Sequence, residues 1–271
     1  MPTTYLVTGA SRGLGFEFVR HLSQDSQNVA IGLVRNKAAA DKKAAEEGLA
    51  NVHFVEAQYT NLPSLKKAAE VVKQITGGGL DYLINNAALV SAISEFKSLS
   101  DFGDNFDILE KELRDSFEIN VVGPIKVIEA FLPLIRNGNV KKIITISTGM
   151  ADINLINDFE IPFGSPYSIS KGAVNVAIAK YNAAHKQEGI LFLSVSPGFV
   201  ATERNKQEPN PEDANKTGAL VEKFVAYAPH FTRPLTPAES VAAVMAVSQK
   251  ASIANGDGGA FVSHTGTKSW L

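Results

Sequence analysis

Short apolar runs alternate with longer amphipathic segments along almost the whole chain. The apolar runs predict buried strands at residues 5–8, 29–34, 52–55, 82–84, 142–147, 191–195 and 260–263. The segments between them predict helices at residues 13–23, 38–47, 65–75, 108–136, 166–188 and 238–250. Strands that alternate with helices in this way form βαβ units. We therefore expect an α/β fold, a doubly wound sheet of about seven parallel strands with helices on both faces.

Two stretches, 150–165 and 203–236, are long for simple connections between these elements. Long loops in compact domains are often lids or binding loops. No repeat and no change in composition marks a second domain. We expect one domain over residues 1–271, with substrate loops in the two long stretches.

The composition excludes several classes of partner. The 271 residues are 45% hydrophobic, which is enough for one sizeable core, and a formal charge of −2 leaves no basic stripe for nucleic acid or for a membrane surface. No apolar run approaches the roughly 18 residues of a membrane span. The chain has no cysteine, and its five histidines lack metal-ligand spacing, so no metal site is expected. The N-terminus enters a strand almost at once, which indicates a mature cytoplasmic protein.

A glycine-rich segment, LVTGASRGLG, joins the first predicted strand to the first predicted helix. It places Gly9, Gly13 and Gly15 at the turn. Glycines let the backbone turn tightly and approach a pyrophosphate, whose charge is favoured at a helix N-terminus. Such a turn can also be purely structural, but its place in the first βαβ unit favours nucleotide binding.

A second segment, SPYSISKGAV, places Tyr167 and Lys171 one helical turn apart. Ser165 is suited to the N-cap position and Pro166 to the first position of the helix. Taken alone, the pair is better explained as a packed tyrosine beside a solvated lysine. Other motifs in the chain change that interpretation.

Five motifs occur in order along the chain: TGASRGLG, LINNAA, INVVGP, YSISK and SPGFVAT. Together they resemble those of the classical short-chain dehydrogenase/reductase family, and the resemblance runs nearly from end to end. It implies a Rossmann-type sheet, a nicotinamide cofactor and chemistry on carbonyl and alcohol groups. The chain departs from the family's N-N-A-G pattern at Ala88, which replaces the usual glycine. The implied cofactor-binding residues are Gly9, Ser11, Arg12, Gly13, Leu14, Gly15, Arg35, Asn36, Gln58, Asn86, Ala87, Ala88, Tyr167, Lys171, Pro197, Gly198, Val200 and Thr202.

With these motifs present, Tyr167 and Lys171 are predicted to be catalytic. Reduction of a ketone leaves an alkoxide that needs a proton, and a phenol can supply it if its pKa of about 10 is brought nearer the working pH. An adjacent ammonium group favours the phenolate. By resemblance, Lys171 also holds the nicotinamide ribose. The same resemblance gives Asn120 the task of organising a water or a helix distortion that connects the lysine to solvent.

A hydroxyl group after the fifth strand polarises the substrate carbonyl in this family. The usual residue is the second serine of an I-S-S sequence, and here Thr148 aligns with it while Ser147 precedes it. Successive strand residues point to opposite faces, so we expect only one of the two to reach the substrate. The alignment without a gap favours Thr148, and Ser147 remains the alternative.

The end of the second strand predicts NADP(H) as the cofactor. An NAD enzyme commonly has an acidic residue there to bind the ribose 2′-OH, whereas this chain has Arg35. Arg12, in the glycine-rich segment, could join Arg35 around a 2′-phosphate, which suits the fork of an arginine. The third strand is followed by Gln58, where the family usually has an adenine-binding aspartate.

The substrate is expected to be a small molecule with a carbonyl or alcohol group. The segments LVRN, YSISK and FVSHTGTKSWL resemble the norsolorinic acid ketoreductase branch of fungal polyketide metabolism, which favours a bulky, aromatic ketone. Segment 152–164 forms either an apolar substrate wall or a small packed loop. Its apolar residues are Ile153, Leu155, Phe159 and Phe163. Four residues further along the chain, with ordinary packing as their alternative role, would supply apolar contacts from the lid side: Phe199, Phe224, Tyr227 and Phe231.

Two other functions remain open at this point. One is a redox sensor that binds NADP without turnover, and the other is an epimerase or dehydratase of a related branch. The intact set of Asn120, Tyr167 and Lys171 weighs against the sensor. The short C-terminal part weighs against the epimerase. By resemblance, we expect a homo-oligomer, a dimer or tetramer, assembled through the long predicted helices 108–136 and 166–188.

Overall fold

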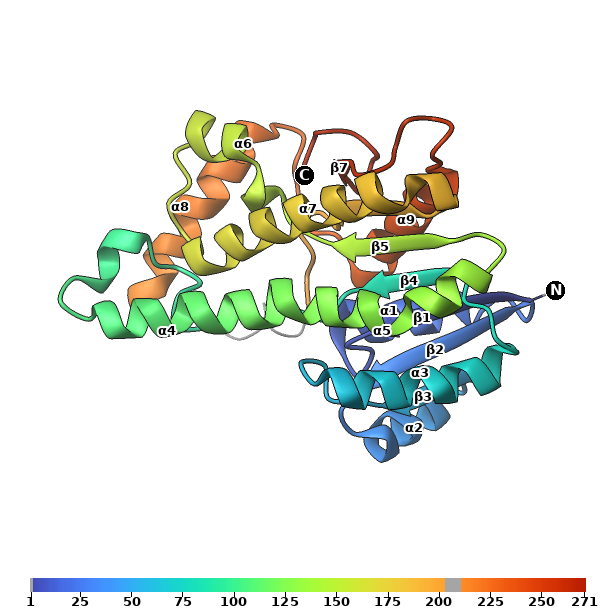
Figure 1. The fold of residues 1–271 in the computed structure, drawn as a ribbon. Helices are drawn as coiled ribbons and strands as arrows, with labels where there is room; N and C mark the ends of the chain where they lie inside the picture. Colours follow the sequence, from blue (N-terminus) through green and yellow to red (C-terminus); the bar gives the residue numbers. More distant parts are fainter. Residues whose placement is uncertain (1, 203–210) are drawn as a thin grey trace.

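The computed structural model describes residues 2–202 and 211–271. This part of the chain forms one sheet of seven parallel strands in the order β3-β2-β1-β4-β5-β6-β7 (Figure 1). The order reverses between β1 and β4, and in such Rossmann-type sheets ligands bind at that point, outside the carboxyl ends of the strands. The predicted fold class is confirmed. The strands are β1 (Thr3–Thr8), β2 (Asn28–Val34), β3 (Val52–Glu56), β4 (Tyr82–Asn85), β5 (Lys142–Ile146), β6 (Leu191–Ser196) and β7 (Phe261–Ser263).

Helices cover both faces of the sheet. One face is packed by α3 (Leu62–Thr76), α5 (Gly123–Asn137) and α7 (Ser165–His185). The other is packed by α1 (Gly13–Leu22), α2 (Lys37–Glu46) and α9 (Pro237–Lys250). Figure 1 shows two more helices beyond the carboxyl ends of the strands, α6 (Ile153–Asp158) and α8 (Pro211–Tyr227).

The strand residues alternate between two hydrophobic cores, as the pleat requires. Leu6, Leu83 and Ile143 point into the core beneath α3, α5 and α7, whereas Val7 and Ile84 point into the core beneath α1 and α9. A third apolar cluster lies apart from both. This roof cluster has Leu155, Ile161, Phe224 and Trp270 at its centre, packed against Met150, Phe159, Phe199, Leu220, Tyr227, Phe261 and Leu271.

The helix predicted at 108–136 is in fact two helices. α4 (Phe106–Phe117) and α5 are separated by a π-helical turn, η2 (Glu118–Val122). Asn120 lies in this turn and is fully buried. A π turn keeps the chain helical, so the spacing of apolar residues does not reveal it.

The two stretches predicted as long loops also contain helices. Residues 150–165 include part of η3 (Gly149–Ala151) and all of α6, whose first turn is capped because Asp152 Oδ1 accepts a hydrogen bond from the Leu155 backbone N–H at 3.0 Å. Residues 203–236 include α8, while 203–210 lie outside the described residues. Both stretches therefore contain helices that the sequence analysis did not place, and their role as substrate loops stays a prediction.

The start of α7 also differs from the prediction. Ser165 is the first helical residue, and its hydroxyl donates to the Pro162 carbonyl at 2.9 Å instead of capping the helix. Gly164 occupies the N-cap position with a left-handed φ of 64°, a conformation that glycine adopts without strain. Tyr167 and Lys171 keep their predicted separation of one turn.

Candidate active site

The glycine turn after β1 needs glycine for two separate reasons. Gly9 and Gly13 have left-handed φ values of 69° and 54°. A Cβ on Gly15 would lie 2.1 Å from the Gly9 carbonyl oxygen and 2.6 Å from Asn86 Nδ2. Arg12 is the N-cap residue of α1, but its side chain makes no capping hydrogen bond. The first turn of α1 thus offers its backbone N–H groups to an anion such as a pyrophosphate.

Asn86 holds the end of β4 against this turn. Its Nδ2 donates to the Thr8 carbonyl oxygen at 3.0 Å, and Thr8 Oγ1 accepts from the backbone N–H groups of Asn86 and Ala87, also at 3.0 Å. Ala87 packs against Gly9, and Ala88 is exposed at the same edge. The structure therefore joins the LINNAA and TGASRGLG motifs at the point where the strand order reverses.

The carboxyl ends of β2 and β3 carry the residues predicted to select the cofactor. Arg35 directly follows β2 and is exposed, as are Ser11 and Arg12 in the glycine turn. Gln58 follows β3 with an exposed side chain, while its backbone N–H donates to Ser64 Oγ at 3.0 Å. Leu14 is partly buried against the core on the α1 face.

The first turn of α2 is satisfied within the protein. Asn36 Oδ1 accepts from the Ala39 backbone N–H at 3.0 Å, and Glu56 Oε2 accepts from the Lys37 backbone N–H at 3.2 Å. The acceptor oxygen of Asn36 therefore serves as a helix cap, which leaves its amide nitrogen for a ligand. The exposed guanidinium of Arg35 directly precedes this capped turn.

The segment after β6 carries the SPGFVAT motif. Gly198 has a φ of 81°, and a Cβ there would lie 3.0 Å from the imidazole of His264. The Pro197 carbonyl oxygen accepts from Ser240 Oγ of α9 at 2.7 Å, and Val200 is buried. Burial lowers the pKa of His264, which favours the neutral imidazole. The sequence analysis gave no role to this histidine.

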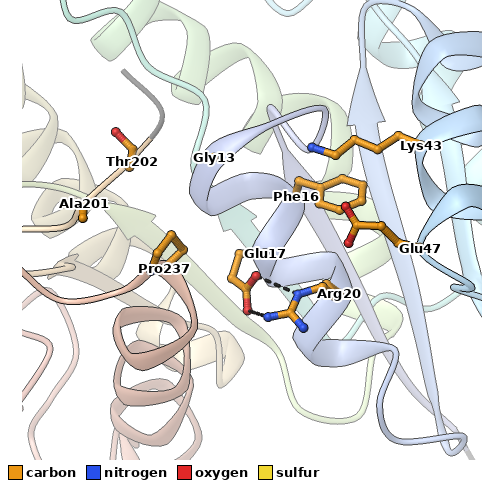
Figure 2. A pocket seen from close by; sticks show the side chains of 9 residues that line it. All are labelled: Gly13, Phe16, Glu17, Arg20, Lys43, Glu47, Ala201, Thr202 and Pro237. Carbon is orange, nitrogen blue, oxygen red and sulfur yellow. Dashed lines mark hydrogen bonds and ion pairs between the residues drawn. The ribbon is translucent and has the colours of Figure 1, made fainter. Parts of the chain in front are cut away.

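Thr202 and the glycine turn border the same space. A pocket of about 220 Å³ lies beside Gly13, with Ala201, Thr202 and Pro237 on one side and Lys43 and Glu47 on the other (Figure 2). It lies beside the expected phosphate-binding turn and is lined by neither Tyr167 nor Lys171. Its lining shows that the segment after β6 reaches back to the N-terminal end of α1.

Tyr167 and Lys171 differ sharply in burial. Lys171 is 3% exposed, and its Nζ donates to the Ile146 carbonyl oxygen at the end of β5, at 2.7 Å. Burial lowers the pKa of Lys171 to about 8. Its Nζ lies 5.8 Å from the centre of the Tyr167 ring, and the tyrosine is partly exposed. The site thus pairs a reachable phenol with a buried ammonium group.

Asn120 connects three segments of the site. Its Oδ1 accepts from the Leu89 backbone N–H at 2.7 Å, and its Nδ2 donates to the Leu89 carbonyl oxygen and to Ser170 Oγ, both at 2.9 Å. Ser170 Oγ donates in turn to the Tyr167 carbonyl oxygen at 2.7 Å. The π turn, the segment after β4 and the first turns of α7 are therefore one hydrogen-bonded unit. Sequence reasoning did not single out Ser170, although it lies within YSISK.

The two hydroxyls after β5 have different surroundings. Ser147 is 1% exposed, and its hydroxyl has no hydrogen-bond partner among the described residues. Thr148 is partly exposed, and its Oγ1 accepts from the Met150 backbone N–H at 3.2 Å. That bond uses an acceptor position, so the hydroxyl proton of Thr148 is still free to bind a ligand.

Most of the apolar residues proposed for a substrate wall pack against one another. Leu155, Phe159, Phe199, Phe224 and Tyr227 all belong to the roof cluster. Phe231 contacts it, because its ring centre lies 5.9 Å from that of Phe199. Ile153 is instead 72% exposed on α6, and Phe163 is partly buried. α6 and α8, which lie in the two long stretches, therefore pack in one layer, and this packing is compatible with either role of segment 152–164.

The sequence profile of the short chain dehydrogenase family matches residues 3–213. The chain therefore belongs to the short-chain dehydrogenase family and is an oxidoreductase, as the five motifs predict. It is 45% identical to the short chain dehydrogenase virK of Hypocrea virens and to the short-chain dehydrogenase/reductase AacuF of Aspergillus aculeatus, each across 100% of both chains.

Solved structures share the fold. The NADPH-bound carbonyl reductase from chicken fatty liver superposes with a TM-score of 0.75 at 23% identity, and the carbonyl reductase Sniffer of D. melanogaster with 0.76 at 23%. Each alignment covers 98% of both chains. At this level of identity the likeness concerns the fold.

Among residues 2–202 and 211–271, no helix is long and apolar enough to cross a membrane. In the same residues, no three or more histidine, aspartate or glutamate side chains gather as metal ligands would.

Proposed function

We propose that this protein is an NADPH-dependent carbonyl reductase that converts a ketone into a secondary alcohol. The observation that carries the proposal is the arrangement on α7, where the partly exposed Tyr167 lies beside the buried Lys171 at the end of β5. A buried cation with a lowered pKa beside a phenol is an arrangement that active sites use and a structural role does not require.

The residues around the switch point fit a nicotinamide dinucleotide phosphate. The uncapped first turn of α1, with Gly9, Gly13 and Gly15 beside it, would hold the pyrophosphate. Arg35 and Arg12 are exposed and would hold the 2′-phosphate. Lys171 would hold the ribose, and the segment from Pro197 to Thr202 would hold the nicotinamide. When bound, NADPH supplies the hydride that adds to the carbonyl carbon.

This chain's own residues would handle the carbonyl oxygen. The Thr148 hydroxyl donates a hydrogen bond to it and withdraws charge from the carbonyl carbon. Tyr167 Oη transfers its proton to the same oxygen as the alkoxide develops, so the product leaves as the neutral alcohol. The Lys171 ammonium stabilises the phenolate that remains. The unit formed by Asn120 and Ser170 holds the tyrosine and the lysine in register.

The substrate class we propose is a bulky, aromatic ketone. The support is the likeness of the chain's end to norsolorinic acid ketoreductases, together with the aromatic residues of the roof cluster above the site. We further propose a cytoplasmic homo-oligomer, a dimer or tetramer, through α4 and α7. Both helices expose large apolar side chains, among them Phe106, Phe117 and Val176. A light-scattering mass equal to the monomer's 29.0 kDa would refute the oligomer.

The proposal is tested by following NADPH oxidation over a panel of aromatic ketones. Tyr167→Phe removes only the hydroxyl, so kcat should fall by about a hundred- to ten-thousandfold while the Kd for NADPH changes less than about twofold. Tyr181→Phe is a matched control on the same helix, because its hydroxyl donates to Glu129 at 2.6 Å, away from the site. Wild-type turnover by Tyr167→Phe would refute the catalytic assignment. Tight NADPH binding without turnover of any ketone would favour a redox sensor.

A further inference from the structure

The last residues of the chain fold back onto strand β7. Gly266 turns with a φ of 76°, and the Ser263 backbone N–H donates to the Thr267 carbonyl oxygen at 2.8 Å. The hydroxyls of Ser263, Thr265 and Thr267 form a short chain of hydrogen bonds across the turn, at 2.8 and 2.9 Å. This turn brings Trp270 onto Phe261, with ring centres 4.4 Å apart and planes at 20°.

Trp270 is 3% exposed and lies directly against the segment after β5. A Cβ on Gly149 would lie 2.6 Å from Trp270 Cβ and 2.7 Å from its Cγ. The Gly149 backbone N–H also donates to Ser196 Oγ at 3.0 Å. The peptide that follows Thr148 is therefore held between β6 on one side and the indole on the other.

The same tryptophan is tied to helix α8. Its backbone N–H donates to Tyr227 Oη at 2.9 Å, and the Tyr227 hydroxyl donates to the Lys268 carbonyl oxygen at 3.2 Å. The Tyr227 ring packs edge-on against Phe159, with centres 5.1 Å apart. The tail thus links the end of β5, the α6 region and α8 through one residue.

We propose that Trp270 is a positioning residue for the carbonyl site. By packing on Gly149 and bonding to Tyr227, it fixes the Thr148 hydroxyl relative to Tyr167 and holds α8 above them. This proposal rests on the proposed reductase function, because it assigns Thr148 to the carbonyl oxygen. The cofactor residues at Gly9–Gly15 and Arg35 make none of these contacts, so Trp270 should affect turnover and not NADPH binding.

The first test removes the indole. We expect Trp270→Ala to lower kcat for 9,10-phenanthrenequinone by about ten- to a hundredfold, the usual effect of shifting a reacting group by about 1 Å. The Kd for NADPH should stay within about twofold of the wild type. Trp270→Phe can still stack on Phe261 and should recover much of the lost kcat. Ser269→Ala is the matched control, since that side chain is exposed and its neighbour carries the contacts. All rates are compared at a temperature where circular dichroism shows each variant folded.

The second test changes Gly149, the residue on which Trp270 packs, and does not remove the indole. Gly149 has no left-handed φ, so alanine is tolerated by the backbone, yet its methyl group collides with the Cβ and Cγ of Trp270. Gly149→Ala should lower kcat and shift the emission of Trp270, the single tryptophan of the sequence, to longer wavelength. Glycine at position 270 also lacks the Cβ, so in Gly149→Ala/Trp270→Gly the collision is absent. The kcat of this double variant should exceed the value obtained by multiplying the separate effects of Gly149→Ala and Trp270→Gly by about threefold or more.

The outcomes separate the two proposals. If the wild type reduces ketones but Trp270→Ala keeps kcat within about twofold, or if the two effects simply multiply, the positioning role is wrong. If Trp270→Ala does not fold, Gly149→Ala with unchanged kcat and emission overturns it instead. If the wild type reduces no ketone, the proposed function is wrong and Trp270 has no carbonyl site to position.

Discussion

Replacing Asn120 by alanine tests how much the π turn between α4 and α5 contributes to the stability of the fold. Its side chain is fully buried and makes three hydrogen bonds, two with the Leu89 backbone and one with Ser170. At about 1 kcal/mol net for each bond, alanine should lower the free energy of unfolding by about 3 kcal/mol. Ser170→Ala removes one of these bonds and the bond to the Tyr167 carbonyl, so about 2 kcal/mol is expected.

The assay is urea unfolding followed by circular dichroism. With a slope of about 3 kcal/mol per molar urea, a loss of 3 kcal/mol moves the midpoint down by about 1 M. Asn137→Ala is the matched control, because that exposed side chain makes one long bond, 3.4 Å, to the Gly78 carbonyl oxygen. Its effect should stay within about 0.5 kcal/mol. If Asn120→Ala unfolds at the same urea concentration as Asn137→Ala, the network does not stabilise the fold.

Three further predictions concern charge. Arg35→Asp should lower kcat/KM for NADPH much more than for NADH, because one charge-assisted bond to the 2′-phosphate contributes about 1.5–3 kcal/mol, or roughly ten- to a hundredfold. An unchanged ratio of kcat/KM for NADPH to kcat/KM for NADH would contradict the assignment. Reductase activity should decline as pH rises through about 8, because Lys171 then loses its proton and no longer stabilises the Tyr167 phenolate. A pH profile that stays flat to about pH 10 would argue against this role. Burial raises the pKa of Asp81, but backbone hydrogen bonds from Thr4, Asn139 and Val140 outweigh it and lower that pKa overall. The stabilising effect of the Asp81 carboxylate is therefore present above the unfolded pKa of about 3.9 and lost as pH falls through the lower folded value. The urea midpoint of Asp81→Asn should consequently decrease less than that of the wild type when the pH is lowered into this range.

The sheet could be predicted from the sequence because its signal is local. Each strand is a short apolar run, and the parallel order follows from helices that alternate with strands. Helix ends were predicted to within a few residues. The start of α3, for example, differs by three residues: the helix begins at Leu62 and not at residue 65, because Asn61 Oδ1 caps it by accepting from the Ser64 N–H at 2.8 Å.

Features that depend on contacts between residues far apart in the chain could not be predicted from local sequence patterns. The π turn is stabilised by hydrogen bonds between Asn120 and Leu89, thirty-one positions away, which the spacing of apolar residues does not predict; only the family resemblance pointed to a helix distortion at Asn120. Asp81 likewise ties the start of β1 to the loop before β5 through four hydrogen bonds from Thr4, Asn139 and Val140. The packing of Trp270 on Gly149 joins residues far apart in sequence, so the single tryptophan gave no signal beyond its place in a distinctive tail.

During synthesis, the glycine turn after β1 and the segment around Gly149 can reach their final packing at different times. Strands β1 to β4 form one side of the sheet and are complete at Asn85, so the glycine turn can meet Asn86 early in synthesis. The packing of Trp270 on Gly149 forms only once Trp270 is made, well over a hundred residues later, which at about 5–20 residues per second is a delay of many seconds. During that interval the members of the roof cluster that are already made lack their contacts with Trp270. A message that lost the codons for Trp270 and Leu271 would leave the proposed phosphate-binding part built and the proposed carbonyl site without its packing on Gly149.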